Sequence, residues 1–165
     1  MKQNIEMYVR SVIFGINDSL VSTVGFLAGI SVAGVPQTTV VLTGLIYALV
    51  EAFSMAAGSY LSEESGREYR FGVQRTNKPE FFAAVLMFFA SIGGAIIPLA
   101  PYLVVAGSQA LLVSVTFSIL GLFLLGAATA RFSRLPAFAR GMRMVFVGGM
   151  AILLGVLVGS FAPPL

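Results

Sequence analysis

Five long apolar segments divide this sequence, and they restrict its fold more than any other feature. Each has close to the roughly 20 residues that an α-helix needs to cross about 30 Å of hydrocarbon. Only 10% of the 165 residues are charged, against about 25% in a typical soluble domain, and the mean hydropathy is +0.94. We therefore predict an all-α integral membrane protein, a single transmembrane domain over residues 1–165. The predicted helices cover about residues 12–33, 39–61, 81–100, 109–130 and 144–161.

The basic residues predict how these helices are oriented. All ten Lys and Arg residues precede the first apolar segment, or lie between the second and third or between the fourth and fifth. Residues 34–38, 101–108 and 162–165 carry no charge. Cytosolic connections are enriched in Lys and Arg, so we expect a cytosolic N-terminus, a C-terminus outside, and a short cytosolic loop at residues 62–80. The net charge of +3 is too small to indicate nucleic-acid binding.

Two acids, Asp18 and Glu51, lie well inside the apolar segments. An ionised carboxylate near the middle of a bilayer costs roughly 2.5–3.5 kcal/mol, and it is tolerated where it meets a partner, a cavity or an ion. An isolated acid could equally be protonated and hydrogen-bonded to a neighbouring helix. Helical spacing, however, places each acid on a stripe of small residues, so that the two can face each other across adjacent helices. Small residues at this spacing let helices approach closely, and we assign this packing role to Gly25, Gly29, Gly44 and Gly58.

Met55 extends the row of possible ligands. Asp18 and Met55 each lie about six residues from the basic end of their segments, and Glu51 lies one turn deeper. Carboxylate oxygens suit hard divalent cations, whereas a thioether favours softer ones. The mixture indicates a borderline ion such as Fe²⁺ or Mn²⁺. A lone Met in an apolar helix usually serves packing, so a ligand role for Met55 depends on the two nearby acids.

Two stretches resemble the vacuolar iron transporter family: IFGINDSLVSTVGFLAGISVAG (13–34) and GLIYALVEAFSMAAGSYLSEES (44–65). The family has phrases like FGxNDGLVSTxGxxxG and SMAxGEYxS in its first and second helices. Here Ser19 replaces the usual Gly, and Ser59 stands where the family often has an acid before Tyr60. Glu51 lies two turns before Ser59 on nearly the same face, so it could substitute for that acid.

The resemblance implies a homodimer with a path between its first and second helices. It implies that this path moves Fe²⁺ or Mn²⁺ out of the cytosol in exchange for protons, with Asp18 and Met55 as the motif Asp and Met. In that dimer we expect the stripe of Gly25 and Gly29 to lie at a close helix contact. Many members also have a long cytosolic metal-binding domain, where this chain has only residues 62–80. Glu63, Glu64 and Glu68 could capture metal there, although a solvated helix end explains them as well.

Proton exchange also follows from the chemistry of the acids. A carboxylate removed from water tends to hold a proton, and a divalent cation displaces it because ligands bind metals in the deprotonated form. The chain has no His, no Cys and no phosphate-binding loop, so we expect no enzyme activity and no permanently bound cofactor. The expected partners are the metal ion, protons, membrane lipid and a second copy, in a plasma, inner or vacuolar membrane. The alternative is a non-transporting scaffold whose buried acids specify helix pairing.

Overall fold

The computed structural model describes residues 2–72, 78–107, 109–132 and 136–162, and these residues are almost entirely helical. Five helices are long and apolar enough to cross a membrane, which confirms the all-α class and the number of spans. No strand occurs in the described ranges. The helices are α1 (Lys2–Val32), α2 (Gln37–Phe71), α3 (Lys78–Val104), α4 (Gln109–Thr129) and α5 (Ala137–Ser160), with the short 3₁₀ helix η1 (Ala130–Phe132) after α4.

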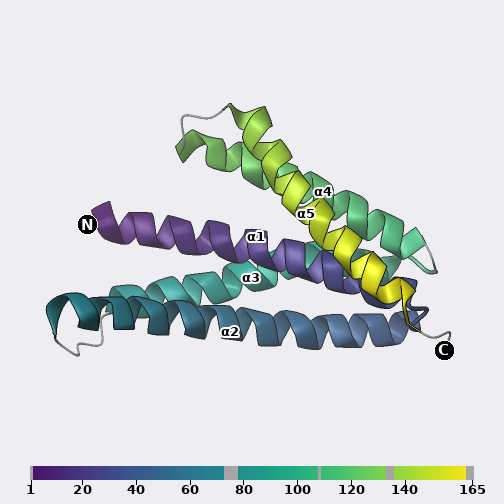
Figure 1. The fold of residues 1–165 in the computed structure, drawn as a ribbon, viewed down its shortest axis with the longest axis horizontal. Coiled ribbons are helices and arrows are strands. Elements are labelled where there is room, and N and C mark those ends of the chain that lie inside the picture. The colour runs from purple at the N-terminus through teal and green to yellow at the C-terminus, as the bar shows by residue number, and fades with distance from the viewer. Residues whose placement is uncertain (1, 73–77, 108, 133–135, 163–165) are drawn as a thin grey trace.

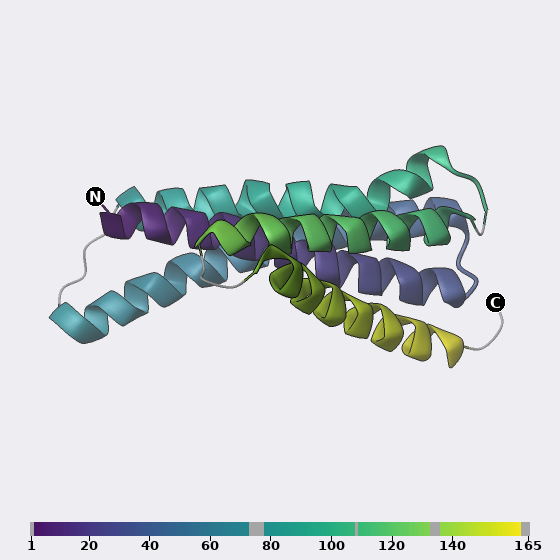
Figure 2. The same cartoon turned by 90° about the horizontal axis from the view of Figure 1, so that it is seen from above.

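Helix α1 lies between the other two helix pairs (Figure 1). It packs most extensively on α3 and α5, while α2 packs on α3 and α4 on α5. The starts of α1, α3 and α5 and the ends of α2 and α4 lie toward the same end of the bundle (Figures 1 and 2). The basic residues of the described ranges belong to these helix ends, and we call this the basic end. Arg75 and Arg134 lie outside the described residues. The cytosolic placement of this end stays a prediction.

Helix α2 is longer than its predicted span. Residues 62–71, which we predicted as part of a short loop, continue the helix, and residues 78–80 already belong to α3. Polar residues such as Glu, Ser and Arg can prolong a helix into water without breaking its backbone hydrogen bonds. Gly72 then ends the helix: it adopts a left-handed conformation with φ 63°, and its N–H bonds to the carbonyl of Glu68, as is common for a glycine after a helix. At 35 residues, α2 is about 52 Å long, well beyond the hydrocarbon thickness.

Two ion pairs hold this extension of α2 against the rest of the basic end. Arg10 of α1 pairs with Glu63, and Arg67 of α2 pairs with Glu80 at the start of α3. Glu80 is only 6% exposed, whereas the side chain of its partner Arg67 is 34% exposed. Removing one member of such a pair leaves an uncompensated charge. The extension is therefore fixed to both neighbouring helices.

The opposite end is closed by an apolar cluster and by two hydrogen bonds from one side chain. Leu27 of α1, Val40 of α2 and Leu99 of α3 are buried together. Beside them, the Gln37 side-chain amide donates to the carbonyls of Tyr102 and Val105, both at 2.7 Å. These bonds fix the start of α2 against the end of α3. The polar residues discussed below therefore lie between this closed end and the basic end.

Close packing of small residues joins α1 to α5. A Cβ added at Gly155 would lie 2.0 Å from the carbonyl oxygen of Gly25, and one at Gly159 would lie 2.1 Å from that of Gly29. The stripe of Gly25 and Gly29 thus makes its close contact with α5 of the same chain. Gly44 is packed against the side chains of Leu99 and Leu27, whereas a Cβ at Gly58 would meet nothing within 4 Å.

Candidate functional site

The structure brings Asp18 and Glu51 together at the interface of α1 and α2. The carboxylate of Glu51 lies within electrostatic range of Asp18, and the hydroxyls of Ser19 and Ser22 lie near it as well. Both acids are partly buried. Helical spacing predicted that the two acids could face each other, and their placement follows that spacing. We call Asp18, Ser19, Ser22 and Glu51, with Tyr47 described next, the α1–α2 site.

Tyr47 orients the carboxylate of Glu51. Its hydroxyl donates to Glu51 Oε1 at 3.2 Å, from one helical turn earlier on α2. Its ring stacks on Phe26 of α1, with centroids 4.5 Å apart and an interplanar angle of 10°. Sequence reasoning missed Tyr47, although a hydroxyl four residues before an intramembrane acid is a recognisable signal.

The second oxygen of Glu51 has spare hydrogen-bonding capacity. Glu51 Oε2 and Ser19 Oγ are both buried, and neither has a hydrogen-bond partner among the described residues. Ser22 Oγ, by contrast, donates to the backbone carbonyl of Asp18 at 2.8 Å. Native proteins seldom leave buried polar atoms unpaired, and such atoms are often found where a ligand or ion binds. The α1–α2 site thus has a carboxylate oxygen, Glu51 Oε2, with capacity for a further bond to the neighbouring hydroxyls of Ser19 and Ser22, to a proton or to a cation.

Met55 faces a different neighbour. Its sulfur accepts a hydrogen bond from Ser91 Oγ of α3 at 3.8 Å, and Ser91 is completely buried. The structure therefore brings Asp18 to Glu51, and it places Met55 one turn further along α2 beside α3. Sequence reasoning did not identify Ser91, because a serine in an apolar segment gives no sign of which helix it faces.

Within the described ranges, no group of three or more His, Cys, Asp or Glu side chains could hold a metal. Glu63 is paired with Arg10, and Glu64 and Glu68 are partly exposed on the extension of α2. The three residues predicted to capture metal thus lie on one helix but do not form such a group. The donors that one chain supplies at the α1–α2 site are two carboxylates and neighbouring hydroxyls.

Comparison with known proteins places these features in a family context. The model of the VIT family matches residues 9–81 and 68–160, so the two matched stretches together include parts of all five helices. The chain is also similar to vacuolar iron transporter homolog 2 of Arabidopsis thaliana. The two are 26% identical over 155 residues, which cover 88% of this chain and 79% of the relative. Asp18, Glu51 and Met55 fall within the first stretch matched by the family model.

Proposed function

This chain belongs to the VIT family, and from this premise we propose that it is a metal transporter that carries Fe²⁺ or Mn²⁺ out of the cytosol in exchange for protons. Its Arabidopsis relative is a vacuolar iron transporter homolog, which supports iron as one substrate. The single observation that carries the proposal is the placement of two intramembrane carboxylates, Asp18 and Glu51, on adjacent helices within electrostatic range of each other. Carboxylates at this depth are costly unless they serve an ion or a proton.

Competition between metal and proton would couple the two fluxes. Without metal, carboxylates in a poorly hydrated path favour the protonated form. A divalent cation binds only the deprotonated ligands and so releases the protons. Tyr47 holds Glu51 Oε1, which leaves Oε2 for the ion or the proton. Exchange then requires only that the site face one side of the membrane at a time.

A homodimer would complete the coordination shell. One chain supplies two carboxylates here, whereas a two-fold dimer with its axis beside the α1–α2 site would present each of them twice. The site would then offer four carboxylates, with the two Met55 thioethers one turn closer to the basic end. Oxygen donors with nearby sulfur suit Mn²⁺ and Fe²⁺. We propose that Glu64 and Glu68, on the extension of α2, attract cations to the entrance electrostatically.

Reconstitution into sealed liposomes tests this function. Liposomes with the purified full chain and liposomes without it are loaded with a pH-sensitive dye and a metal-sensitive dye. We expect addition of Fe²⁺ or Mn²⁺ to give metal entry together with proton exit, and both to be absent without protein. Metal entry without proton movement would contradict the exchange mechanism. The absence of flux for both metals, from protein that is folded and dimeric, would favour the scaffold alternative.

A further inference from the structure

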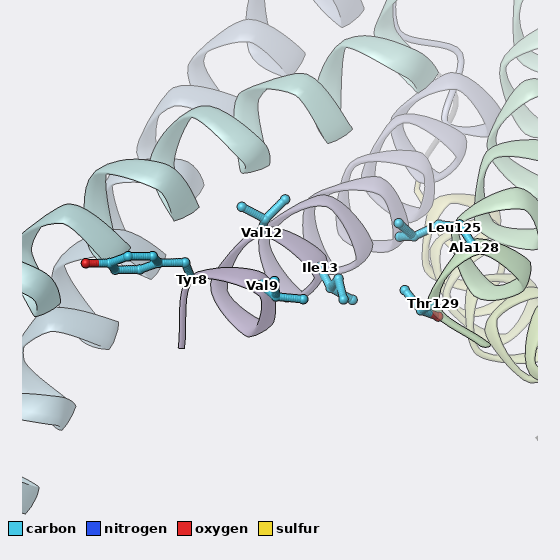
Figure 3. Close-up of a pocket in the computed structure, with 7 residues that line it drawn as sticks. All are labelled: Tyr8, Val9, Val12, Ile13, Leu125, Ala128 and Thr129. Atoms are coloured by element: carbon cyan, nitrogen blue, oxygen red, sulfur yellow. The ribbon is translucent and has the colours of Figure 1, made fainter. Parts of the chain in front are cut away.

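A second feature, an apolar groove, opens between α1 and α4 toward the basic end (Figure 3). Its volume is about 350 Å³. Val9 and Ile13 of α1 line one side, and Leu125, Ala128 and Thr129 of α4 line the other. Figure 3 shows Ile13 directed toward Leu125 and Thr129 across the groove. The groove uses none of the residues of the α1–α2 site.

Arg140 contacts Thr129 at the end of this groove, and Arg131 lies two residues after Thr129 in the sequence; neither has a carboxylate partner among the described residues. Arg140 Nε donates to Thr129 Oγ1 at 3.1 Å, so its guanidinium lies at the rim. Arg131 follows α4 within two residues of Thr129 and is exposed. The sequence contains no Asp or Glu after Glu80. In the described part of the chain, ion pairs join Arg10 to Glu63 and Arg67 to Glu80, and none involves the arginines at this rim.

Thr129 fixes the rim arginine in place. Its hydroxyl accepts from Arg140 and itself donates to the carbonyl of Gly126 at 2.9 Å. A guanidinium has several N–H donors, so the bond to Thr129 leaves the terminal nitrogens of Arg140 available to an anion. Glu6 is the acid of α1 closest in sequence to the groove. Its side chain is exposed, and it lies one turn before Val9, toward the start of α1.

We propose that the groove binds an anionic phospholipid, with one acyl chain between α1 and α4 and the headgroup phosphate against Arg131 and Arg140. A groove that is apolar along its length and ends near arginines without carboxylate partners among the described residues matches this amphipathic molecule in both shape and charge. Basic pockets between transmembrane helices are typical sites for anionic headgroups. The two arginines therefore select for lipid charge, while the groove binds the chain that any phospholipid has. Such a lipid would link the α4–α5 pair to α1.

Native mass spectrometry of the full chain in mild detergent tests this site. The chain is titrated with phosphatidylglycerol or with phosphatidylcholine that has the same acyl chains. We expect phosphatidylglycerol to bind roughly tenfold more tightly or better, as two arginines near the phosphate imply. Equal affinity of the wild-type chain for the two lipids would overturn the proposal.

Two sets of variants separate the headgroup from the acyl chain. Arg131→Gln with Arg140→Gln should remove the preference for phosphatidylglycerol and weaken phosphatidylcholine binding much less, whereas Lys78→Gln, at the start of α3, should keep the preference. Ala128→Phe fills the groove and should weaken both lipids, whereas Leu124→Phe, on a 65% exposed residue of the same helix, should weaken neither. An unchanged preference in the double arginine variant would contradict the headgroup contact. Far-UV circular dichroism verifies that each variant is folded, and Arg131→Gln alone, on an exposed residue, provides a milder form.

Other occupants of the groove give different results. If inorganic phosphate binds the chain and Ala128→Phe leaves lipid binding intact, the arginines hold a free anion, and the lipid proposal is wrong. If Ala128→Cys forms disulfides between copies in the membrane, a second copy covers the groove, and the proposal is equally wrong. Lipid-dependent protection of Ala128→Cys from a membrane-soluble thiol reagent, stronger with phosphatidylglycerol, would support it.

Discussion

Glu51 is fixed on one oxygen and free on the other, and this asymmetry makes it useful at the α1–α2 site. Tyr47 donates to Oε1 and is itself held by stacking on Phe26, so the carboxylate has a defined orientation. Oε2 is buried without a partner among the described residues, and an unpaired polar atom in a low-dielectric region has a high free energy. A cation or a proton would remove that cost. Glu51 and Asp18 thus form a place where positive charge is favoured.

Met55 should affect the choice of metal more than the rate of transport. Met55→Leu keeps the size and apolar character of the side chain but removes the thioether, which favours softer ions. We expect the ratio of Fe²⁺ to Mn²⁺ flux to fall, with total flux for Mn²⁺ within a factor of about two of wild type, since its oxygen ligands remain. Competition between the two metals in proteoliposomes measures the ratio. Met150→Leu, on α5 and 45% exposed, is the matched control, and an equal shift in both variants would contradict the assignment.

At the scale of single residues, the sequence identifies the two intramembrane acids more easily than the residues that contact them in the fold. Asp18 and Glu51 could be recognised because a carboxylate inside an apolar segment is rare, whatever the fold. Tyr47 stands four residues before Glu51, a signal that sequence reasoning missed, whereas Ser91 could not be selected, because Ser is common in membrane helices and its role depends on which helix it faces. The pairing of Glu80 with Arg67 was also missed, because it joins two segments whose contact depends on the path between α2 and α3.

Helices α1 and α5 approach each other so closely that, at their contact, no residue with a side chain larger than that of glycine would fit without a shift. Gly25 and Gly29 on α1 lie against Gly155 and Gly159 on α5, and the two parallel helices meet where both have small residues four positions apart. Apolar helices in lipid associate through such packing because no hydrophobic effect favours one helix partner over another. The five segments were predictable from hydropathy. Their partners were not, since nothing in an apolar surface specifies which other apolar surface it meets.

A single methyl group should disturb this crossing. Gly155→Ala would place a Cβ 2.0 Å from the carbonyl oxygen of Gly25, so the two backbones must separate, at a cost of roughly 1–3 kcal/mol. Gly149→Ala, on the same helix, meets nothing within 4 Å and should be neutral or stabilise the helix by up to about 1 kcal/mol. Thermal unfolding in a mild detergent compares the two variants. Equal melting temperatures would show that the crossing is looser than described.

The whole molecule has one charged end and one closed apolar end. The basic end has the extension of α2 with its two ion pairs, and the other end has the apolar cluster of Leu27, Val40 and Leu99. The one-sided charge was predictable from counting Lys and Arg along the chain. A helix end was one interpretation of Glu63, Glu64 and Glu68, but its length was not predictable, because the contacts with Arg10 and Glu80 that bring it against α1 and α3 depend on the fold.

Cysteine labelling tests the orientation of the two ends. The chain has no native Cys, so Ser65→Cys, on the exposed extension of α2, and Ala106→Cys, after α3 and exposed, each introduce a single thiol. In sealed right-side-out vesicles, we expect a membrane-impermeant maleimide to label Ala106→Cys and to label Ser65→Cys only after permeabilisation, because positive charge favours the cytosolic side. The opposite pattern would reverse the direction of transport.

The most direct test of the central claim is metal flux through Asp18→Asn. The amide keeps the size and polarity of the side chain, so a role in helix pairing through hydrogen bonds should survive, but it cannot offset the charge of a divalent ion in a site of low dielectric. Glu6→Gln, on the exposed start of the same helix, is the matched control. We predict that Asp18→Asn folds and dimerises like wild type yet loses at least about 90% of Fe²⁺ and Mn²⁺ flux, roughly 1.4 kcal/mol or more of transition-state stabilisation, while Glu6→Gln retains it. Normal flux through folded Asp18→Asn would contradict the assignment of Asp18 as a metal ligand and favour the scaffold role.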